Sequence, residues 1–239
     1  MSFQKGFIVR RFIKNKYLVL NLLLLVFVFS AVIARANGEN IKSSELNVYL
    51  PINNVDTKET VYSLTLNLLG KEDEENVKLI SQILKGMKIK ATFFVRSQWV
   101  EDNYSLGKKI IDDGHSFGLL INNKKTSLMG RGALDFLAEE NSMFLKHFGN
   151  IPKCVRIEMD KSGKISEMIG AFGQTYVSYS STFDLSSEIK NGDIVLITVV
   201  SSTIPYDVAE YVGENIKNNF TAIPLCDLLS LNNIETSNN

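Results

Sequence analysis

The sequence predicts an α/β fold of parallel strands joined by helical crossovers, either a barrel or a doubly wound sheet. From about residue 48 onward, short apolar runs rich in β-branched and aromatic residues alternate with amphipathic runs. The amphipathic runs carry their apolar residues at helical spacing, so each would pack one face against a sheet. Periodicity does not choose between the two architectures. In a barrel, functional side chains lie at the C-terminal ends of the strands.

Strands are expected where β-branched and aromatic residues dominate a short apolar run. The first two such runs are VYSLTLNLL at residues 61–69 and IKATFFV at residues 89–95. Further strands are expected at residues 115–121, 154–157, 175–179, 193–200 and 221–226.

Helices are expected between most of these strands. In the first, residues 72–85, Val77, Ile80 and Leu84 share one face. Its acidic start could be imagined as a metal site, but acids in a first helical turn are better explained by the helix dipole. The other helices are expected at residues 105–113, 134–148, 162–172 and 206–217.

The N-terminal part of the chain differs from the rest in composition. Five basic residues and no acidic one lie in residues 1–16, and an uncharged apolar run about as long as a membrane-spanning helix follows. The alternative for this run is a cleaved signal peptide, because small residues follow it. Either reading puts the folded domain outside the cytoplasmic membrane, and the anchor makes a single-pass cell-membrane protein. We therefore expect a basic cytoplasmic tail (1–16), a transmembrane signal-anchor (17–35), a linker (36–47), a folded domain (48–231) and a polar tail (232–239).

Charge and cysteine content argue against two classes of protein. The 26 basic and 26 acidic residues balance, so no nucleic-acid partner is expected. Two cysteines are too few for a disulfide framework. Cys154 and Cys226 lie in apolar stretches typical of buried strands, and we interpret them as packing thiols. A bridge between them in an oxidising compartment is the alternative.

Four short strings in register resemble the polysaccharide deacetylases of the NodB-homology type, the family 4 carbohydrate esterases. They are KIKATFFV (88–95), GHSFG (114–118), PKCVR (152–156) and NGDIVL (191–196). The resemblance covers about residues 48–229 and implies a distorted (β/α) barrel. The lead-in at residues 50–57 is similar to that of the sporulation-associated subgroup of spore-forming bacteria.

Members of that family remove acetyl groups from chitin-like sugars or peptidoglycan. An Asp and two His residues hold zinc or another divalent metal, a second Asp acts as general base, and a late His acts as general acid. Such chemistry needs an open metal position and titratable groups within reach of the acetyl carbonyl.

At each of these positions the residue present here lacks the required chemistry. The base position is Asn67, whose amide cannot take a proton from water. Leu68 covers the metal Asp, and Leu120 and Lys124 replace the two metal His residues. Thr198 replaces the late His. We therefore expect no metal cofactor and no catalytic residue.

Few polar residues remain to line a groove. Arg156 is kept from an Arg-x-Pro-x-Gly motif of the family, where it orients the catalytic Asp; here it would face Asn67 or pair with Glu158, Asp160 or Asp184. Ordinary loop positions are the alternative for the rest. The candidate groove residues are Arg156, Glu158, Asp160, Asn122, Asn123 and Asp184.

Neither histidine lies at a metal position of the family. His115 is expected to be a structural hydrogen-bonding residue near a strand start. His147 is expected in a last helical turn, where it complements the helix dipole.

Together these observations predict an inactive, membrane-anchored deacetylase-like protein outside the cytoplasmic membrane. Its expected partners are peptidoglycan or another cell-wall glycan, or a membrane or cell-wall protein, with sporulation as the setting. The alternative is an active, metal-dependent deacetylase of peptidoglycan or chitooligosaccharide with a non-standard site.

Overall fold

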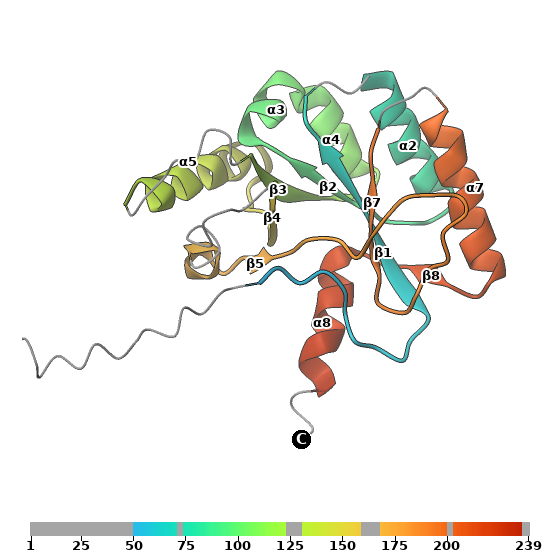
Figure 1. Cartoon of the computed structure of the whole chain (residues 1–239). Coiled ribbons are helices and arrows are strands. Elements are labelled where there is room, and N and C mark those ends of the chain that lie inside the picture. Colours follow the sequence, from blue (N-terminus) through green and yellow to red (C-terminus); the bar gives the residue numbers. More distant parts are fainter. Residues whose placement is uncertain (1–49, 71–73, 123–130, 159–167, 200–202, 236–239) are drawn as a thin grey trace, which may run out of the picture. The chain divides into compact units, whose positions relative to one another are not determined.

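The centre of the domain is an eight-stranded sheet in which every named pair of strands runs parallel (Figure 1). The order is β5-β4-β3-β2-β1-β7-β6, and β8 pairs with β1. This computed structural model describes residues 50–70, 74–122, 131–158, 168–199 and 203–235, all within one compact unit. The strands form a half-barrel, which is consistent with the distorted (β/α) barrel expected from the sequence.

The strands lie close to the apolar runs that predict them. Their bounds are β1 (Val61–Leu68), β2 (Thr92–Val95), β3 (Ser116–Asn122), β4 (Cys154–Glu158), β5 (Thr175–Tyr176), β6 (Ser181–Thr182), β7 (Ile194–Ile197) and β8 (Thr221–Ala222). The sequence did not indicate β6, which is only two residues long.

The helices follow the predicted alternation with two additions, the short α3 after β2 and α8 near the C-terminus. Their bounds are α2 (Glu74–Gly86), α3 (Ser97–Asp102), α4 (Tyr104–Asp112), α5 (Arg131–Phe148), α7 (Ile204–Lys217) and α8 (Leu225–Glu235), with a 3₁₀ turn, η1, at Gly170–Phe172. No described helix is both long and apolar enough to span a bilayer, and the predicted anchor at 17–35 lies outside the described residues. Most of the helix predicted at 162–172 also lies outside them.

The last predicted strand, residues 221–226, is wrong beyond its start. Only Thr221 and Ala222 pair with β1, and α8 begins at Leu225. Pro224 ends the strand because it has no N–H for a ladder, and its carbonyl accepts the N–H groups of Asp227 and Leu228 in the first turn of α8. Cys226 therefore lies on a helix.

Side chains alternate between two apolar clusters on the two faces of the sheet. On β1, Leu64, Leu66 and Leu68 pack into the larger cluster, which the helices α2 and α7 complete. Thr65 and Asn67 occupy the positions between them and face the inside of the half-barrel. The smaller cluster lies on this inner face and joins strands to α8; its buried members are Val55, Phe94, Leu120, Cys154, Val177, Ile194, Leu225 and Leu228.

A buried polar network joins α2 and α4 to the start of β3. The side chain of Asp113 is 2% exposed and accepts hydrogen bonds from Lys85 Nζ at 2.7 Å and Ser81 Oγ at 3.0 Å, with Lys109 Nζ at 3.4 Å. Burial raises the pKa of this carboxyl, but the bonds from Lys85 and Ser81 and the charge of Lys109 outweigh burial and hold it below its usual value.

His115 extends the same network and confirms its predicted structural role. Its Nδ1 accepts the N–H of Ala91 at 3.1 Å, and its Nε2 lies 2.9 Å from the carbonyl of Ser81. These partners require the neutral Nε2–H tautomer. Burial lowers the pKa of His115, against the opposite effects of the Ser81 carbonyl and Asp113.

Candidate functional site

Arg156 lies on the inner face of the half-barrel and connects β4 to β1 and to the segment after β5. It sits in the middle of β4, at the same level as Leu120 of β3. Its Nη1 donates to Asn67 Oδ1 at 2.9 Å, and its Nη2 donates to Thr65 Oγ1 at 3.0 Å and to the carbonyl of Ser178 at 2.8 Å. The alternation of β1 places Thr65 and Asn67 on the same side, two residues apart. Arg156 thus faces Asn67, the residue at the position of its expected family partner, and hydrogen-bonds to its amide oxygen.

Two aromatic rings enclose the guanidinium. Its central carbon lies 4.1 Å from the ring centroid of Phe94 and 5.6 Å from that of Tyr179. Phe94 in turn lies over Gly118 of β3, where a Cβ atom would be only 2.4 Å from the ring. The inner face beside Arg156 is thus filled by an aromatic side chain that needs glycine opposite it.

Arg156 is a buried cation whose partners are all neutral among the described residues. It is 2% exposed, and its Nε is buried without a hydrogen-bond partner. Burial lowers its pKa to about 9, while Tyr179 and Cys154 act in the opposite direction. It remains protonated at neutral pH. The expected ion pairs with Glu158 and Asp184 are not formed, and Asp160 lies outside the described residues.

Asp184 is engaged elsewhere. It is exposed, and its Oδ1 accepts the N–H and the hydroxyl of Ser186, both at 2.9 Å. These two bonds lower the pKa of its carboxyl. Asp184 therefore stabilises a local turn after β6 and does not reach Arg156.

The other replaced positions differ in burial and in the face of the sheet on which they lie. Leu120 is completely buried on the inner face with Phe94. Thr198 is exposed immediately after β7, and the pairing of Leu66 with Ile197 puts it level with Asn67. Leu68 lies on the other face of β1, in the core beneath the helices.

The remaining groove candidates cluster where β3 and β4 end. Asn122 pairs with Glu158 in the sheet, and Glu158 is half-buried two residues after Arg156. Asn123 and Lys124 lie outside the described residues. Sequence reasoning missed Phe94, Tyr179 and Thr65. The two-residue spacing of Thr65 from Asn67 could have indicated Thr65, whereas Tyr179 carries no such signal.

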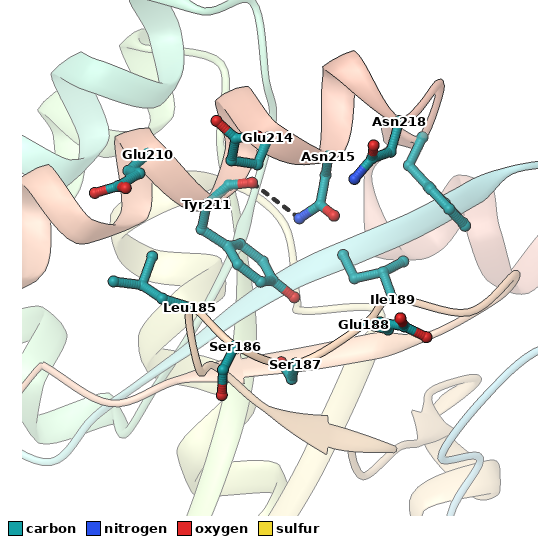
Figure 2. A pocket seen from close by; sticks show the side chains of 11 residues that line it. Leu185, Ser186, Ser187, Glu188, Ile189, Glu210, Tyr211, Glu214, Asn215 and Asn218 are labelled. Atoms are coloured by element: carbon teal, nitrogen blue, oxygen red, sulfur yellow. Dashed lines mark hydrogen bonds between the residues drawn. The ribbon is translucent and has the colours of Figure 1, made fainter.

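A hollow lies elsewhere, between α7 and the segment after β6 (Figure 2). It has a volume of about 570 Å³ and includes none of the predicted site residues. Tyr211 projects from α7 into it, and the carboxylates of Glu188, Glu210 and Glu214 point in different directions rather than toward one another. Its walls therefore offer no convergent set of catalytic or ligating groups.

The fold and the inner-face site define a half-barrel α/β domain of parallel strands joined by helical crossovers. Residues 54–120 match the model of the polysaccharide deacetylase family. No match to a curated protein was found from sequence. Among solved structures, the chain is similar to a family 4 carbohydrate esterase from Bacillus anthracis, with a TM-score of 0.68, 21% identity, and coverage of 80% of this chain and 92% of that one.

Two further solved structures share the fold. A pseudoenzyme of the same esterase family from Bacillus anthracis gives a TM-score of 0.65 at 19% identity and covers 76% of this chain and 69% of that one. The peptidoglycan deacetylase PdaC from Bacillus subtilis gives 0.61 at 16%, covering 77% and 96%. The fold is that of family 4 carbohydrate esterases, the NodB fold, which confirms the resemblance found in the sequence; the sporulation subgroup stays a prediction.

The described residues do not fit the divalent metal of that esterase family. Asn67 Oδ1 accepts a hydrogen bond from Arg156, and Leu120 offers no ligand atom. Within the described ranges, no three His, Cys, Asp or Glu side chains come together as metal ligands would.

Proposed function

We propose that this protein is a catalytically inactive relative of polysaccharide deacetylases that binds cell-wall glycan. The observation that carries the proposal is the hydrogen bond between Arg156 and Asn67. At the position where the family has its general base, this chain has the amide of Asn67. That amide accepts a hydrogen bond from Arg156 and cannot take a proton from water. The similarity to an esterase pseudoenzyme supports the same conclusion.

The proposal includes the setting of the protein. Residues 17–35 would anchor it in the cell membrane with the domain outside, as their length and the basic residues before them indicate. The lead-in at residues 50–57 is the basis for extending the proposal to sporulation.

Tyr179 is the residue most suited to contact a sugar at this site. It is 39% exposed, and its ring lies beside Arg156. Glu158 is the last residue of β4, the strand that carries Arg156, and its carboxylate can accept hydrogen bonds from a sugar. An exposed aromatic face with polar groups at its edge is a common arrangement for ligand binding. The similar fold of a peptidoglycan deacetylase supports peptidoglycan as the glycan.

Co-sedimentation tests this proposal. The full-length chain in detergent should pellet with purified peptidoglycan, and Tyr179→Ala should weaken pelleting by about tenfold, since an aromatic contact of this kind is worth about 1.4 kcal/mol. Tyr104→Ala is the matched control: Tyr104 is 43% exposed but stacks on Phe148 of α5, on the outer side of the sheet. It should pellet like the wild type.

The alternatives give different results in the same preparation. A chain that binds only a protein partner has no reason to pellet with the glycan. An active deacetylase would contain stoichiometric zinc, nickel or cobalt and release acetate from peptidoglycan or chitooligosaccharide. Either result would overturn the proposal.

A further inference from the structure

The two cysteines lie against each other beneath the inner face of the half-barrel. Cys154 is the first residue of β4, and Cys226 lies in the first turn of α8. Both thiols are free, and their Sγ atoms are 3.8 Å apart. A disulfide bond is about 2.05 Å long. A small approach of helix to strand would therefore suffice to join them.

The two thiols differ in access. Cys154 is 2% exposed, whereas Cys226 is half-buried. Cys226 also lines a pocket of about 470 Å³ that opens beside the starts of β3 and β4, with His115 and Lys153 in its wall. A small reagent can therefore reach Cys226 first.

The two thiols also differ in acidity. The pKa of Cys226 is lowered, first by the hydrogen bond from the Cys154 thiol and then by Lys153, although burial and Asp227 oppose this. The pKa of Cys154 is raised by Cys226 and by burial, against weaker effects of Arg156 and Lys153. The thiolate is the nucleophile in disulfide chemistry. Both the lowered pKa and the greater exposure therefore favour Cys226 as the attacking thiol.

We propose that Cys226 and Cys154 form a thiol–disulfide exchange pair that reversibly bonds α8 to β4. The Cys226 thiolate attacks one sulfur of a disulfide oxidant such as oxidised glutathione, breaks its S–S bond and displaces one glutathione thiolate. Cys154 then loses its proton, attacks Cys226 Sγ in the mixed disulfide and displaces the second glutathione. The oxidant gains two electrons and ends as two thiols, which take up the two protons that the cysteines lose.

The bond would fix the floor of the proposed site. Cys154 precedes Arg156 by two residues on the same face of β4. Leu225 and Leu228 of α8 belong to the same apolar cluster as Leu120. The cross-link would therefore hold α8 against the strand that positions Arg156. This redox function is independent of glycan binding.

Oxidation of the reduced full-length chain with oxidised glutathione tests the pair. Denaturing alkylation and peptide mass mapping should find a linked Cys154–Cys226 peptide pair that reductant separates. The oxidised chain should unfold about 5–10 °C above the reduced one, since the bond closes a long loop. Cys154→Ser should stop at a glutathione adduct on Cys226. Cys226→Ser should be modified at Cys154 at least about tenfold more slowly, because that thiol is buried and protonated.

Each other outcome would overturn part or all of the proposal. The absence of a linked peptide in the wild-type chain would refute the exchange pair, and that measurement needs no substitution. Equal rates of modification in the two variants would refute Cys226 as the attacking thiol. If either variant fails to fold, as judged by circular dichroism, brief alkylation of the native wild type settles the order, since Cys226 should be labelled before Cys154.

Discussion

Asp113 and Arg156 are both almost completely buried, yet their charges are compensated in different ways. The Asp113 carboxylate has two lysines and a hydroxyl around it. Arg156 has an amide, a hydroxyl and a carbonyl, and none of its partners in the described ranges carries a negative charge. A buried charge is costly unless it is paired. The Asp113 carboxylate is thus paired with cations, whereas Arg156 has only neutral partners among the described residues, with Asn67 where the resemblance implies an Asp.

The largest effect on the free energy of unfolding is expected at Asp113, whose charge is compensated by lysines. Asp113→Asn should lower the free energy of unfolding by about 2 kcal/mol. The substitution removes the attraction to Lys85 and Lys109 and exchanges one acceptor oxygen for a donor beside them, although both lysines stay partly solvated. Urea unfolding at pH 7 measures the change.

A surface pair provides the control for this substitution. Glu75→Gln weakens an ion pair with Lys78 in which the Glu75 side chain is 79% exposed, so the free energy of unfolding should change by less than about 0.5 kcal/mol. Equal effects of Asp113→Asn and Glu75→Gln would mean that burial adds nothing to the Asp113 network.

The second prediction restores a negative charge beside Arg156. Asn67→Asp should raise the free energy of unfolding at pH 7 by about 1–2 kcal/mol, since a charged hydrogen bond replaces a neutral one to a buried guanidinium. Arg156 would depress the pKa of the new carboxyl. The gain should therefore be present above about pH 4, the unfolded value, and disappear as the pH falls through the folded pKa.

Asn67→Ala is the control, because it removes the acceptor without adding charge. It should destabilise the domain by about 1 kcal/mol. A destabilising Asn67→Asp would show that the cost of burying the new carboxylate exceeds its attraction to Arg156. Unfolding curves of both variants at pH 7 and pH 3.5 distinguish these cases.

The strand and helix pattern was predictable because burial enforces it. The β2 string Thr92–Val95 is completely buried between two apolar clusters, so only apolar or β-branched residues suit it. The short α3 could not be predicted from the sequence, because six residues are too few to show helical periodicity. The strand predicted through Cys226 is wrong because Pro224 has no N–H for a ladder and α8 begins at Leu225.

The sequence indicated which residues form the site better than it indicated how their side chains are arranged. Motif order gave Asn67 and Arg156, and the structure joins them. Motif order placed Leu68 at a metal position, whereas the alternation of strand residues puts it on the face opposite Asn67, toward the helices. Motif order could not show that Asp184 is engaged by Ser186, since a local turn depends on backbone geometry.

The smallest expected effect concerns His115, which borders the Asp113 network and not Arg156. Its pKa is lowered in the folded state, chiefly by burial, with Lys85 acting in the same direction and the Ser81 carbonyl and Asp113 against it. Below the unfolded value of 6.5 the unfolded chain therefore binds more protons at this position. The stability that neutral His115 provides is complete above that pH and declines as the pH falls toward the folded pKa. The free energy of unfolding should drop between pH 7 and pH 5. His115→Gln should be less stable at pH 7 but lack this decline, whereas His147→Gln should keep it. A His115→Gln variant with the wild-type pH dependence would assign the decline to another group.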